Sequence, residues 1–545
     1  MNEQTIDHVG QHPTGRASDD VPYVKAAPWS DLNVIKMIDR PGIDPDRIAL
    51  VCEAERRTYG QIKDRYRRVA HALADLGLDR FARVGVTMTN RVEYFEIELG
   101  ITGAAGIMVG LSWRLTAVER VNLLRRSRAQ AVIAEEQFVP PLALARDQGQ
   151  LPDLRWIVSL GEATGADFEY EELCAKGRAD PLTVPPMSFD DPHEIIYTSG
   201  TTGQPKGAVW SNGTVMWNSI QQVMDFGLEP GHSNYVTLDL HYIGGRHDFT
   251  FAMLHQGATV HLRPSGGFDS RQVVEYVAEH KISHVLWVPT MLYEILRLSG
   301  LAEIDLSHLK MIMCGGAPLP REMITQAQAV FPRTAFVQVY GLTEGGGTTS
   351  FVPSDFLTSK VGSAGRTSMH NEIRIVGDGG AACSIGVVGE IAIKGPAVSP
   401  GYWDNEAATK ETFRDGWLYT GDLGYLDEDG FLYVAGRQKD MIITGGMNVY
   451  PSEVEHVLLQ HWAIEEVAVI GLPDPKWGEK ICAVVVVAKG TTLDEADVTA
   501  FCRERLAGFK KPTSIVTVVE LPKTTSGKVQ KYLLRQSVPV PGARA

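Results

Sequence analysis

Short β-branched runs alternate with helical segments through most of the chain. In one such unit, Asp269 and Ser270 begin a segment whose three valines share one face at the 3.6-residue period of a helix. A β-branched run follows and stops at a proline, which predicts a strand at 282–288; further strands are predicted at 310–313 and 335–340. This alternation is typical of an α/β fold, in which helices cover both faces of a mainly parallel sheet. Ligands bind in such sheets beside the carboxyl ends of the strands.

The pattern differs at both ends of the chain. Residues 1–30 have no apolar periodicity and are predicted to be a loose leader. Beyond Gly436, the apolar runs are sufficient for one small α+β domain. We therefore predict a leader at 1–30, an N-terminal domain at 31–437 and, after a short junction, a C-terminal domain at 438–545. The C-terminal domain is expected to contain strands at 466–470, 481–488 and 515–519 and a helix at 494–506.

Composition and charge narrow the classes of function. The chain has 545 residues, of which 44% are hydrophobic and 22% charged, as in an ordinary enzyme of several domains. Its 52 basic and 66 acidic residues give a net charge of −14, which disfavours binding to nucleic acid or to an anionic membrane. The apolar stretch 99–113 is interrupted by glycines and is shorter than the ~20 residues of a spanning helix. We expect a cytoplasmic enzyme with no integral membrane segment.

Cysteine and histidine spacing argues against a metalloprotein. The six cysteines are isolated, and neither a CxxC pair nor an HExxH motif is present. His241 and His247 are close in sequence but lack a third ligand nearby. We therefore expect no metal site made of protein ligands alone.

One glycine-rich segment is a candidate for chemistry. Residues 197–207 read Tyr-Thr-Ser-Gly-Thr-Thr-Gly-Gln-Pro-Lys-Gly. Such a loop can direct backbone N–H groups at phosphate oxygens while Lys206 supplies a positive charge. The spacing is not that of a Walker A loop. A surface loop rich in glycine and threonine has the same composition, so the residues alone leave both interpretations open.

Further motifs resemble those of the adenylate-forming superfamily, which includes acyl-CoA synthetases, aryl-CoA ligases, luciferases and peptide-synthetase adenylation domains. The segment 197–207 resembles its phosphate loop, 340–344 its YGxTE motif and 419–422 its TGD motif. Residues 436–440 resemble its hinge and 522–528 its C-terminal lysine motif. The resemblance spans residues 30 to 535, in the order that the family shows. It implies two doubly wound α/β halves and a small β-barrel-like part, followed by a small mobile α+β domain.

The resemblance also implies a reaction and its nucleotide site. A carboxylate attacks the α-phosphate of ATP and releases pyrophosphate, and Mg²⁺ is held by Thr198 and Glu344. Asp422 is expected to accept both ribose hydroxyls and Arg437 to donate to ribose or phosphate, while Tyr340 stacks on adenine. The remaining residues expected to bind nucleotide are Ser199, Gly200, Thr201, Thr202, Gly203, Lys206, Gly315, Gly316, Ala317, Pro318, Gly341, Thr343 and Lys439.

The C-terminal motifs imply movement between two half-reactions. By resemblance, Lys528 lies over the α-phosphate and carboxylate during adenylation, and Asp440 is the hinge. Gly445 and Gly446 add backbone freedom and could admit the pantetheine thiol of coenzyme A. The catalytic residues expected are Lys528, Glu344, Thr198 and His241.

The thiol acceptor is expected to be coenzyme A, because Thr444-Gly-Gly-Met-Asn-Val-Tyr-Pro resembles the form found in fatty-acyl and related CoA synthetases. The alternatives are an acyl-AMP ligase that loads a carrier protein, an aryl-CoA ligase, and a catalytically silent nucleotide- or acyl-binding regulator. A hydrolase is disfavoured, since Ser199 has no recognisable base. A homodimer is compatible with the sequence.

Motifs define the acyl site less well than the nucleotide site. His241 matches the position at the mouth of the acyl pocket, and Gly244–Asp248 stands where the family is usually apolar. That segment indicates either a polar group on the acid or a solvent-facing helix start, and we favour the second. Gly345–Gly347 would leave the channel floor without side chains, which predicts a medium-to-long-chain or bulky alicyclic acid. The expected pocket residues are His241, Tyr242, Phe249, Met291, Gly345 and Gly346.

Overall fold

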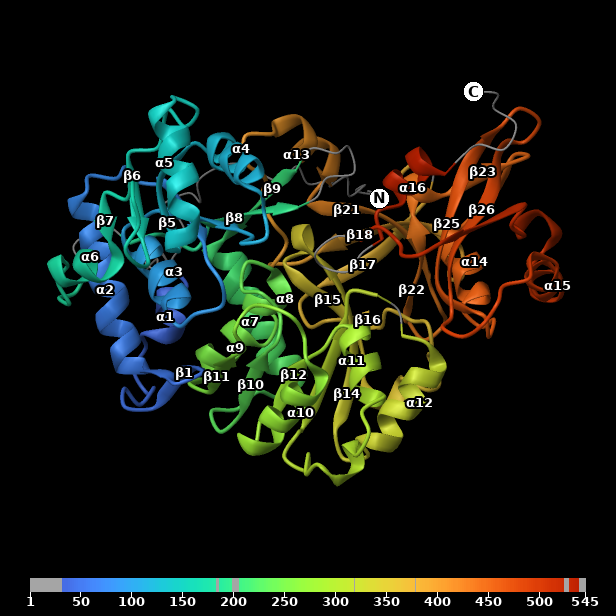
Figure 1. Ribbon diagram of the computed structural model, residues 1–545, viewed down its shortest axis with the longest axis horizontal. Coiled ribbons are helices and arrows are strands. Elements are labelled where there is room, and N and C mark those ends of the chain that lie inside the picture. The colour runs from blue at the N-terminus through green and yellow to red at the C-terminus, as the bar shows by residue number, and fades with distance from the viewer. Residues whose placement is uncertain are drawn as a thin grey trace, which may run out of the picture.

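Four β-sheets organise the part of the chain that the structure describes. The computed structural model describes residues 32–182, 186–198, 205–317, 319–377, 379–523 and 529–538. Figure 1 shows two large sheets with their helices in the N-terminal region, a smaller sheet between them and the C-terminal part, and a fourth sheet in the C-terminal part itself. The α/β fold class, with a large N-terminal region and a smaller C-terminal domain, is confirmed.

The first large sheet has eight strands in the order β19-β9-β8-β4-β3-β5-β6-β7. From β8 to β7 all neighbours are parallel, and β8 pairs antiparallel with β9. The strands are β3 (Arg83–Thr87), β4 (Ile107–Leu111), β5 (Ala129–Ala134), β6 (Trp156–Ser159), β7 (Phe168–Glu169), β8 (Pro192–Thr198), β9 (Lys206–Ser211) and β19 (Gly401–Tyr402). The helices of this segment are α2 (Tyr59–Asp75), α3 (Glu93–Gly103), α4 (Ala117–Ser127), α5 (Val139–Asp147) and α6 (Tyr170–Lys176).

The second large sheet has nine strands in the order β16-β15-β14-β13-β12-β10-β11-β1-β2, parallel from β14 to β1. The strands are β1 (Ile48–Cys52), β2 (Glu55–Thr58), β10 (Ser233–Val236), β11 (Thr259–Leu262), β12 (His284–Leu286), β13 (Met311–Gly315), β14 (Ala335–Leu342), β15 (Gly347–Val352) and β16 (Arg366–Thr367). Its segment also contains helices α1 (Ile35–Ile38), α7 (Asn212–Phe226), α8 (Ile243–Arg246), α9 (Thr250–Gln256), α10 (Ser270–Glu279), α11 (Pro289–Leu296) and α12 (Arg321–Val330).

Local sequence signals account for several of these elements. Helix α10 begins where the apolar periodicity predicts, because the Asp269 carboxylate accepts the backbone N–H of Gln272 and caps the first turn. The strand after it, β12, is shorter than the predicted 282–288. The stretch 99–113 divides into the end of α3 and strand β4. Within the described part of the chain, no helix is both long and apolar enough to cross a membrane.

The two large sheets share one apolar core. A single cluster of buried side chains contains Val86 on β3, Met108 on β4 and Trp210 on β9 together with Phe251 on α9 and Val260 on β11. Because these residues come from both sheets and their helices, the two halves are packed as one body. Loops at the carboxyl ends of both sheets can therefore contribute to one site.

The third sheet is antiparallel throughout. Its strands are β17 (Glu372–Val376), β18 (Gly389–Lys394), β20 (Phe413–Arg414), β21 (Trp417–Leu426) and β22 (Leu432–Arg437), and helix α13 (Glu406–Thr412) lies in the same segment. Strand β22 ends at Arg437, where the predicted N-terminal domain ends. The turn η5 (Gln438–Asp440) follows. The boundary between residues 437 and 438 stays a prediction.

The C-terminal part is an α+β unit built around the fourth sheet. Its strands are β23 (Ile442–Thr444), β24 (Met447–Val449), β25 (Ile464–Asp474), β26 (Gly478–Val487) and β27 (Ser514–Val518), and its helices are α14 (Pro451–Leu458), α15 (Glu495–Arg505) and α16 (Lys531–Ser537). Buried side chains on both faces of this sheet form two separate apolar clusters. The strands and helix predicted for this region are present, with β25 and β26 longer than expected.

Candidate functional site

The base of the glycine-rich loop lies against the YGxTE segment. Strands β8 and β9 form an antiparallel pair that places Thr198 opposite Lys206. The Thr198 hydroxyl lies 3.5 Å from Glu344 Oε1, and the Tyr402 hydroxyl donates to the same oxygen at 2.9 Å. A carboxylate beside a hydroxyl offers the oxygen ligands that Mg²⁺ prefers. The residues predicted to hold Mg²⁺ are therefore adjacent and chemically suited to it.

Backbone contacts fix the position of Glu344. It lies in the turn η3 (Thr343–Gly345), directly after β14. The Trp210 indole N–H donates to the carbonyl of Thr343 at 2.8 Å, and the backbone N–H of Ser399 donates to the carbonyl of Glu344 at 3.0 Å. The backbone at Glu344 is thus held from β9 on one side and from the segment before β19 on the other.

Tyr402 is a site residue that the sequence analysis missed. Burial, together with the neighbouring Glu344 carboxylate, raises the pKa of its phenol well above the usual value, so it stays a hydrogen-bond donor. The Lys206 ammonium lies 5.1 Å from the centroid of its ring. Tyr402 pairs with Ala208 across β9 and β19, which are about 190 residues apart in sequence. Local motifs give no sign of such a pairing.

A second cluster joins the TGD motif to the YGxTE motif. The Tyr340 hydroxyl donates to Asp422 Oδ2 at 2.7 Å, and the Arg437 guanidinium donates from Nε to Oδ1 at 2.8 Å. Asp422 and Arg437 are paired residues on β21 and β22. Each carboxylate oxygen has two lone pairs and uses one here, so Asp422 can still accept two hydroxyl donors. Burial raises the pKa of the Tyr340 phenol, with a further rise from Asp422.

The segment predicted to face adenine follows β13. Gly315 ends that strand, and a Cβ atom there would lie 2.5 Å from Val339 Cγ2. Gly316 has a left-handed backbone at φ +90° and an open approach, and Ala317 beside it is exposed. The segment therefore presents backbone next to β14, on which Tyr340 lies. Pro318 and residues 199–204, which include Ser199, Gly200, Thr201, Thr202 and Gly203, lie outside the described residues, as does Lys528.

The predicted hinge is held by an ion pair. Asp440 lies at the end of η5, and Arg535 Nη2 on α16 donates to its Oδ1 at 2.8 Å. Helix α16 belongs to the segment that follows the lysine motif. Partial burial and the nearby Arg437 and Arg535 lower the pKa of Lys439, which precedes Asp440. The described part of the hinge is thus bonded to the element that follows Lys528 in sequence.

Gly445 and Gly446 form the two-residue turn of the β23–β24 hairpin. Their φ angles are +58° and +78°, the left-handed region at both positions that a type I′ turn requires. A Cβ atom at Gly445 would lie 2.9 Å from the Trp477 ring, and its N–H donates to the Trp477 carbonyl at 2.8 Å. This turn explains both glycines locally, and their role toward coenzyme A stays a prediction.

The residues predicted for the acyl pocket divide into two groups. His241 is buried, contacts the tilted ring of Tyr242 with ring centroids 4.0 Å apart, and has no hydrogen-bond partner for either ring nitrogen in the described part of the chain. Burial lowers its pKa to about 4, so the imidazole is neutral near pH 7. Met291 is half-buried and receives the Thr237 hydroxyl at 3.7 Å. Phe249, in contrast, has 0% exposure and packs on Phe226 in the core, so it adds no surface to an open pocket.

The favoured interpretation of Gly244–Asp248 as a solvent-facing helix start is wrong. Arg246 and His247 have 0% exposure and enter a buried charge network with Glu194 on β8. Arg246 also lies 3.6 Å from Glu98 on α3, and its Nη1 donates to the Tyr94 hydroxyl at 2.9 Å. The physical reason is charge pairing: two buried carboxylates require a cation, and α8 supplies it. Two charged residues within otherwise buried elements, Glu98 and Glu194, were the signal that the sequence analysis missed.

This network does not need a metal ion. Ligand atoms of Glu98, Glu194 and His247 lie within 4.8 Å of one another and could in principle hold one. However, the Arg246 guanidinium already lies between the two carboxylates and offsets one of their two negative charges, and His193 contacts Glu98 at 2.9 Å. A second cation would have to displace it. The network is therefore an ion-pair cluster.

The glycines after Glu344 serve packing and not an open channel. A Cβ atom at Gly346, where φ is +79°, would lie 1.9 Å from the Ala397 carbonyl oxygen. At Gly345 it would lie 2.9 Å from Leu342 Cδ2, and at Gly347 it would lie 2.8 Å from Asn218 Oδ1. These positions face packed atoms, so their lack of side chains says nothing about channel length. These glycines therefore give no support to the prediction of a medium-to-long-chain or bulky alicyclic acid.

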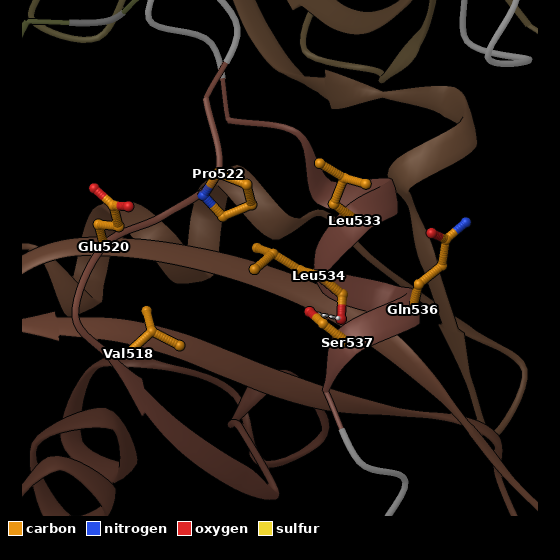
Figure 2. Close-up of a pocket in the computed structure, with 7 residues that line it drawn as sticks. All are labelled: Val518, Glu520, Pro522, Leu533, Leu534, Gln536 and Ser537. Atoms are coloured by element: carbon orange, nitrogen blue, oxygen red, sulfur yellow. Dashed lines mark hydrogen bonds between the residues drawn. The ribbon is translucent and has the colours of Figure 1, made fainter.

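A cleft of about 440 Å³ lies in the C-terminal part, between the end of β27 and α16. Figure 2 shows its lining, with Leu534 on α16 directed toward Pro522 and Val518 and Leu533 above it. The remaining lining residues are Glu520, Gln536 and Ser537. None of the predicted site residues lines this cleft.

Comparison with known proteins agrees with the two-part architecture. The model of the AMP-binding enzyme family matches residues 40–403, and that of the AMP-binding enzyme C-terminal domain matches residues 453–528. An indoleacetate–CoA ligase from Aromatoleum aromaticum is 34% identical over 509 residues, which cover 93% of this chain and 98% of the relative. A feruloyl-CoA synthase from Amycolatopsis is 36% identical over 480 residues, covering 88% and 93%.

A solved structure of a CoA ligase is also similar to this chain. The anthranilate CoA ligase AuaEII in complex with anthranoyl-AMP has a TM-score of 0.85 and is 26% identical, covering 93% of this chain and 97% of that one. The family model matches well over half of the chain, and the relatives match it nearly end to end. The chain therefore belongs to the family of AMP-binding enzymes.

Proposed function

We propose that this chain is an ATP-dependent acid–CoA ligase that activates a ring-bearing, aromatic carboxylic acid. The acid first forms an acyl-adenylate with release of pyrophosphate, and its acyl group then passes to the thiol of coenzyme A with release of AMP. The observation that carries the proposal is the near full-length likeness to ligases of indoleacetate and ferulate, on a chain whose nucleotide motifs meet in space.

The described residues support this chemistry by positioning and charge. Glu344 and Thr198 would hold the Mg²⁺ that accompanies ATP, and Lys206 would supply positive charge at the base of the phosphate loop. Asp422, oriented by Tyr340 and Arg437, would accept the ribose hydroxyls. In phosphoryl and nucleotidyl chemistry of this kind, catalysis is mainly positioning and charge stabilisation. Lys528 is proposed to add its charge at the reacting carboxylate.

The nature of the acid is a choice between two classes. The relatives named above act on indoleacetate and ferulate, both of which carry aromatic rings. The opposing expectation of a medium-to-long-chain or alicyclic acid depended on Gly345–Gly347, which face packed atoms. An aromatic acid is therefore the better-supported class.

Pyrophosphate release with ATP and MgCl₂ tests the proposal. The acids are indole-3-acetate, ferulate, benzoate, cyclohexanecarboxylate, octanoate, palmitate and acetate, each with and without coenzyme A. We expect multiple turnovers with an aromatic acid only when coenzyme A is present. Preference for octanoate or palmitate would overturn the acid class, and a single-turnover burst indifferent to coenzyme A would indicate a carrier protein as acceptor. A Glu344→Gln preparation purified in parallel controls for contaminating activity.

A further inference from the structure

Asp248 is the one member of the Arg246-His247-Asp248 triplet that does not enter the buried charge network. Its side chain is half-buried, and it accepts the Thr348 hydroxyl at 3.5 Å from Oδ1. Among the described residues, no basic group lies within ion-pair distance of its carboxylate. The neighbouring Arg246 and His247 are both directed to Glu194 instead. Asp248 is therefore a carboxylate whose hydrogen-bonding capacity is largely unused.

Its place in the fold connects the two segments predicted to bind the acid. Asp248 lies four residues after Gly244, the end of the His241–Gly244 segment. Thr348 directly follows Gly345–Gly347 and lies four residues after Glu344. Oδ2 lies 3.9 Å from the point where a Cβ atom of Gly244 would be, so a glycine leaves that side of the carboxylate uncovered. The Asp248 carboxylate thus lies next to the His241–Gly244 segment, which is predicted to bind the acid, and against strand β15, which follows Glu344.

The surroundings of Asp248 leave its ionised carboxylate poorly stabilised. Burial raises the pKa of its carboxyl to about 7, only partly offset by the Thr348 hydroxyl. The nearby polar groups of α7 do not compensate it, because Asn218 and Gln222 donate to the carbonyl of His247. A half-buried carboxylate with one weak partner gains most from a ligand that brings a hydrogen-bond donor.

We propose that Asp248 is a specificity-determining residue whose carboxylate, with the Thr348 hydroxyl, selects acids that carry a hydrogen-bond donor on the ring, away from the reacting carboxylate. A phenolic hydroxyl or a ring N–H fits this requirement, and a second carboxylate is repelled. The inference rests on the proposed function, since it takes a ring-bearing acid as substrate.

Matched pairs of acids test the inference. Each pair differs only in the donor: 4-hydroxycinnamate against 4-methoxycinnamate and cinnamate, indole-3-acetate against benzothiophene-3-acetate, and 8-hydroxyoctanoate against octanoate. 2-Succinylbenzoate supplies a second carboxylate. Values of kcat/KM are measured at pH 8.5, where Asp248 is ionised. The wild-type chain is expected to prefer the donor-bearing acid by about 10–100-fold.

Two variants separate charge from hydrogen bonding. Asp248→Leu should reduce the preference to within about threefold of unity while the acid without the donor keeps its kcat/KM, which also shows that the variant is folded. Asp248→Asn should keep part of the preference and should raise kcat/KM for 2-succinylbenzoate, because an amide accepts but does not repel. Asp225→Asn, the same change at a carboxylate on α7 that binds the backbone N–H of Met369, is the control and should leave every ratio unchanged.

The outcomes distinguish the two proposals. Equal kcat/KM values within the pairs for wild type, or a preference that survives in Asp248→Leu, would overturn the role of Asp248 and leave the proposed function intact. Turnover of only the octanoate pair would overturn the aromatic acid class, while the ratio within that pair would still decide the role of Asp248.

Discussion

At the scale of single residues, the site depends on the Glu344 carboxylate and the two hydroxyls beside it, those of Thr198 and Tyr402. We expect Glu344→Gln to lower the rate of pyrophosphate release by about 10²–10³-fold, because the amide keeps the shape but removes the charge opposite Thr198. Tyr402→Phe keeps the ring near Lys206 and removes only one hydrogen-bond donor to Glu344. Its rate of pyrophosphate release should therefore fall by less than about tenfold. Initial rates against MgCl₂ concentration measure both. Equal losses in the two variants would show that Glu344 has no special role.

Lys528 carries the sharpest prediction at a single position. If its charge acts on the α-phosphate and the acid, Lys528→Ala should slow adenylation by about 10²–10³-fold. Thioester formation from synthetic acyl-adenylate and coenzyme A should change by less than about threefold, because that step no longer needs the charge. Lys523→Ala is the matched control, because Lys523 lies in the same motif as Lys528 but forms an ion pair with Glu466 on β25. Comparable loss in both half-reactions would contradict the assignment.

At the scale of elements, the hinge can be separated from its ion pair. Asp440→Pro fixes φ at the hinge, and we expect one half-reaction to fall by about a hundredfold while the other is retained. Asp440→Asn keeps backbone freedom and weakens only the contact with Arg535, so both half-reactions should change by less than about threefold. Pyrophosphate release and turnover of synthetic acyl-adenylate measure the two steps separately. Equal loss of both in Asp440→Pro would remove the hinge assignment.

Elements also show what sequence patterns can and cannot predict. Helix α10 and strands β13 and β14 were predicted because periodicity and capping act over a few residues. The approach of Tyr402 to Glu344 and the burial of Arg246 were not, since each depends on pairing between distant segments. The glycines after Glu344 were misinterpreted for the same reason, because the Ala397 carbonyl that excludes a side chain at Gly346 is 51 residues away. That Glu344 lies near Thr198, and Tyr340 near Asp422, was expected only because the resemblance implied it.

At the scale of the whole molecule, the buried charge network joins the two large sheets. Glu194 on β8 and Glu98 on α3 belong to the eight-stranded sheet and its helices, whereas Arg246 is on α8, in the segment of the nine-stranded sheet. Such a network stabilises the assembly only when it is complete, because a buried charge without its partner is costly. The relative position of the sheets, and with it the site between them, is expected to depend on this pairing.

Removing the cation therefore tests the connection between the sheets. Arg246→Met should destabilise the protein by about 3–5 kcal/mol, because it removes the guanidinium from two buried carboxylates and leaves Glu98 with only His193 and Glu194 with only His247 as partners. Arg128→Met breaks an exposed pair with Asp404 and should cost at most about 1 kcal/mol. Urea unfolding followed by circular dichroism compares the variants. In the double variant Arg246→Met/Glu194→Gln, the loss should be smaller than the sum of the single losses, since both charges of one pair are gone. Additive losses would mean that Arg246 contributes by packing alone and that the two sheets are held together by their shared apolar core.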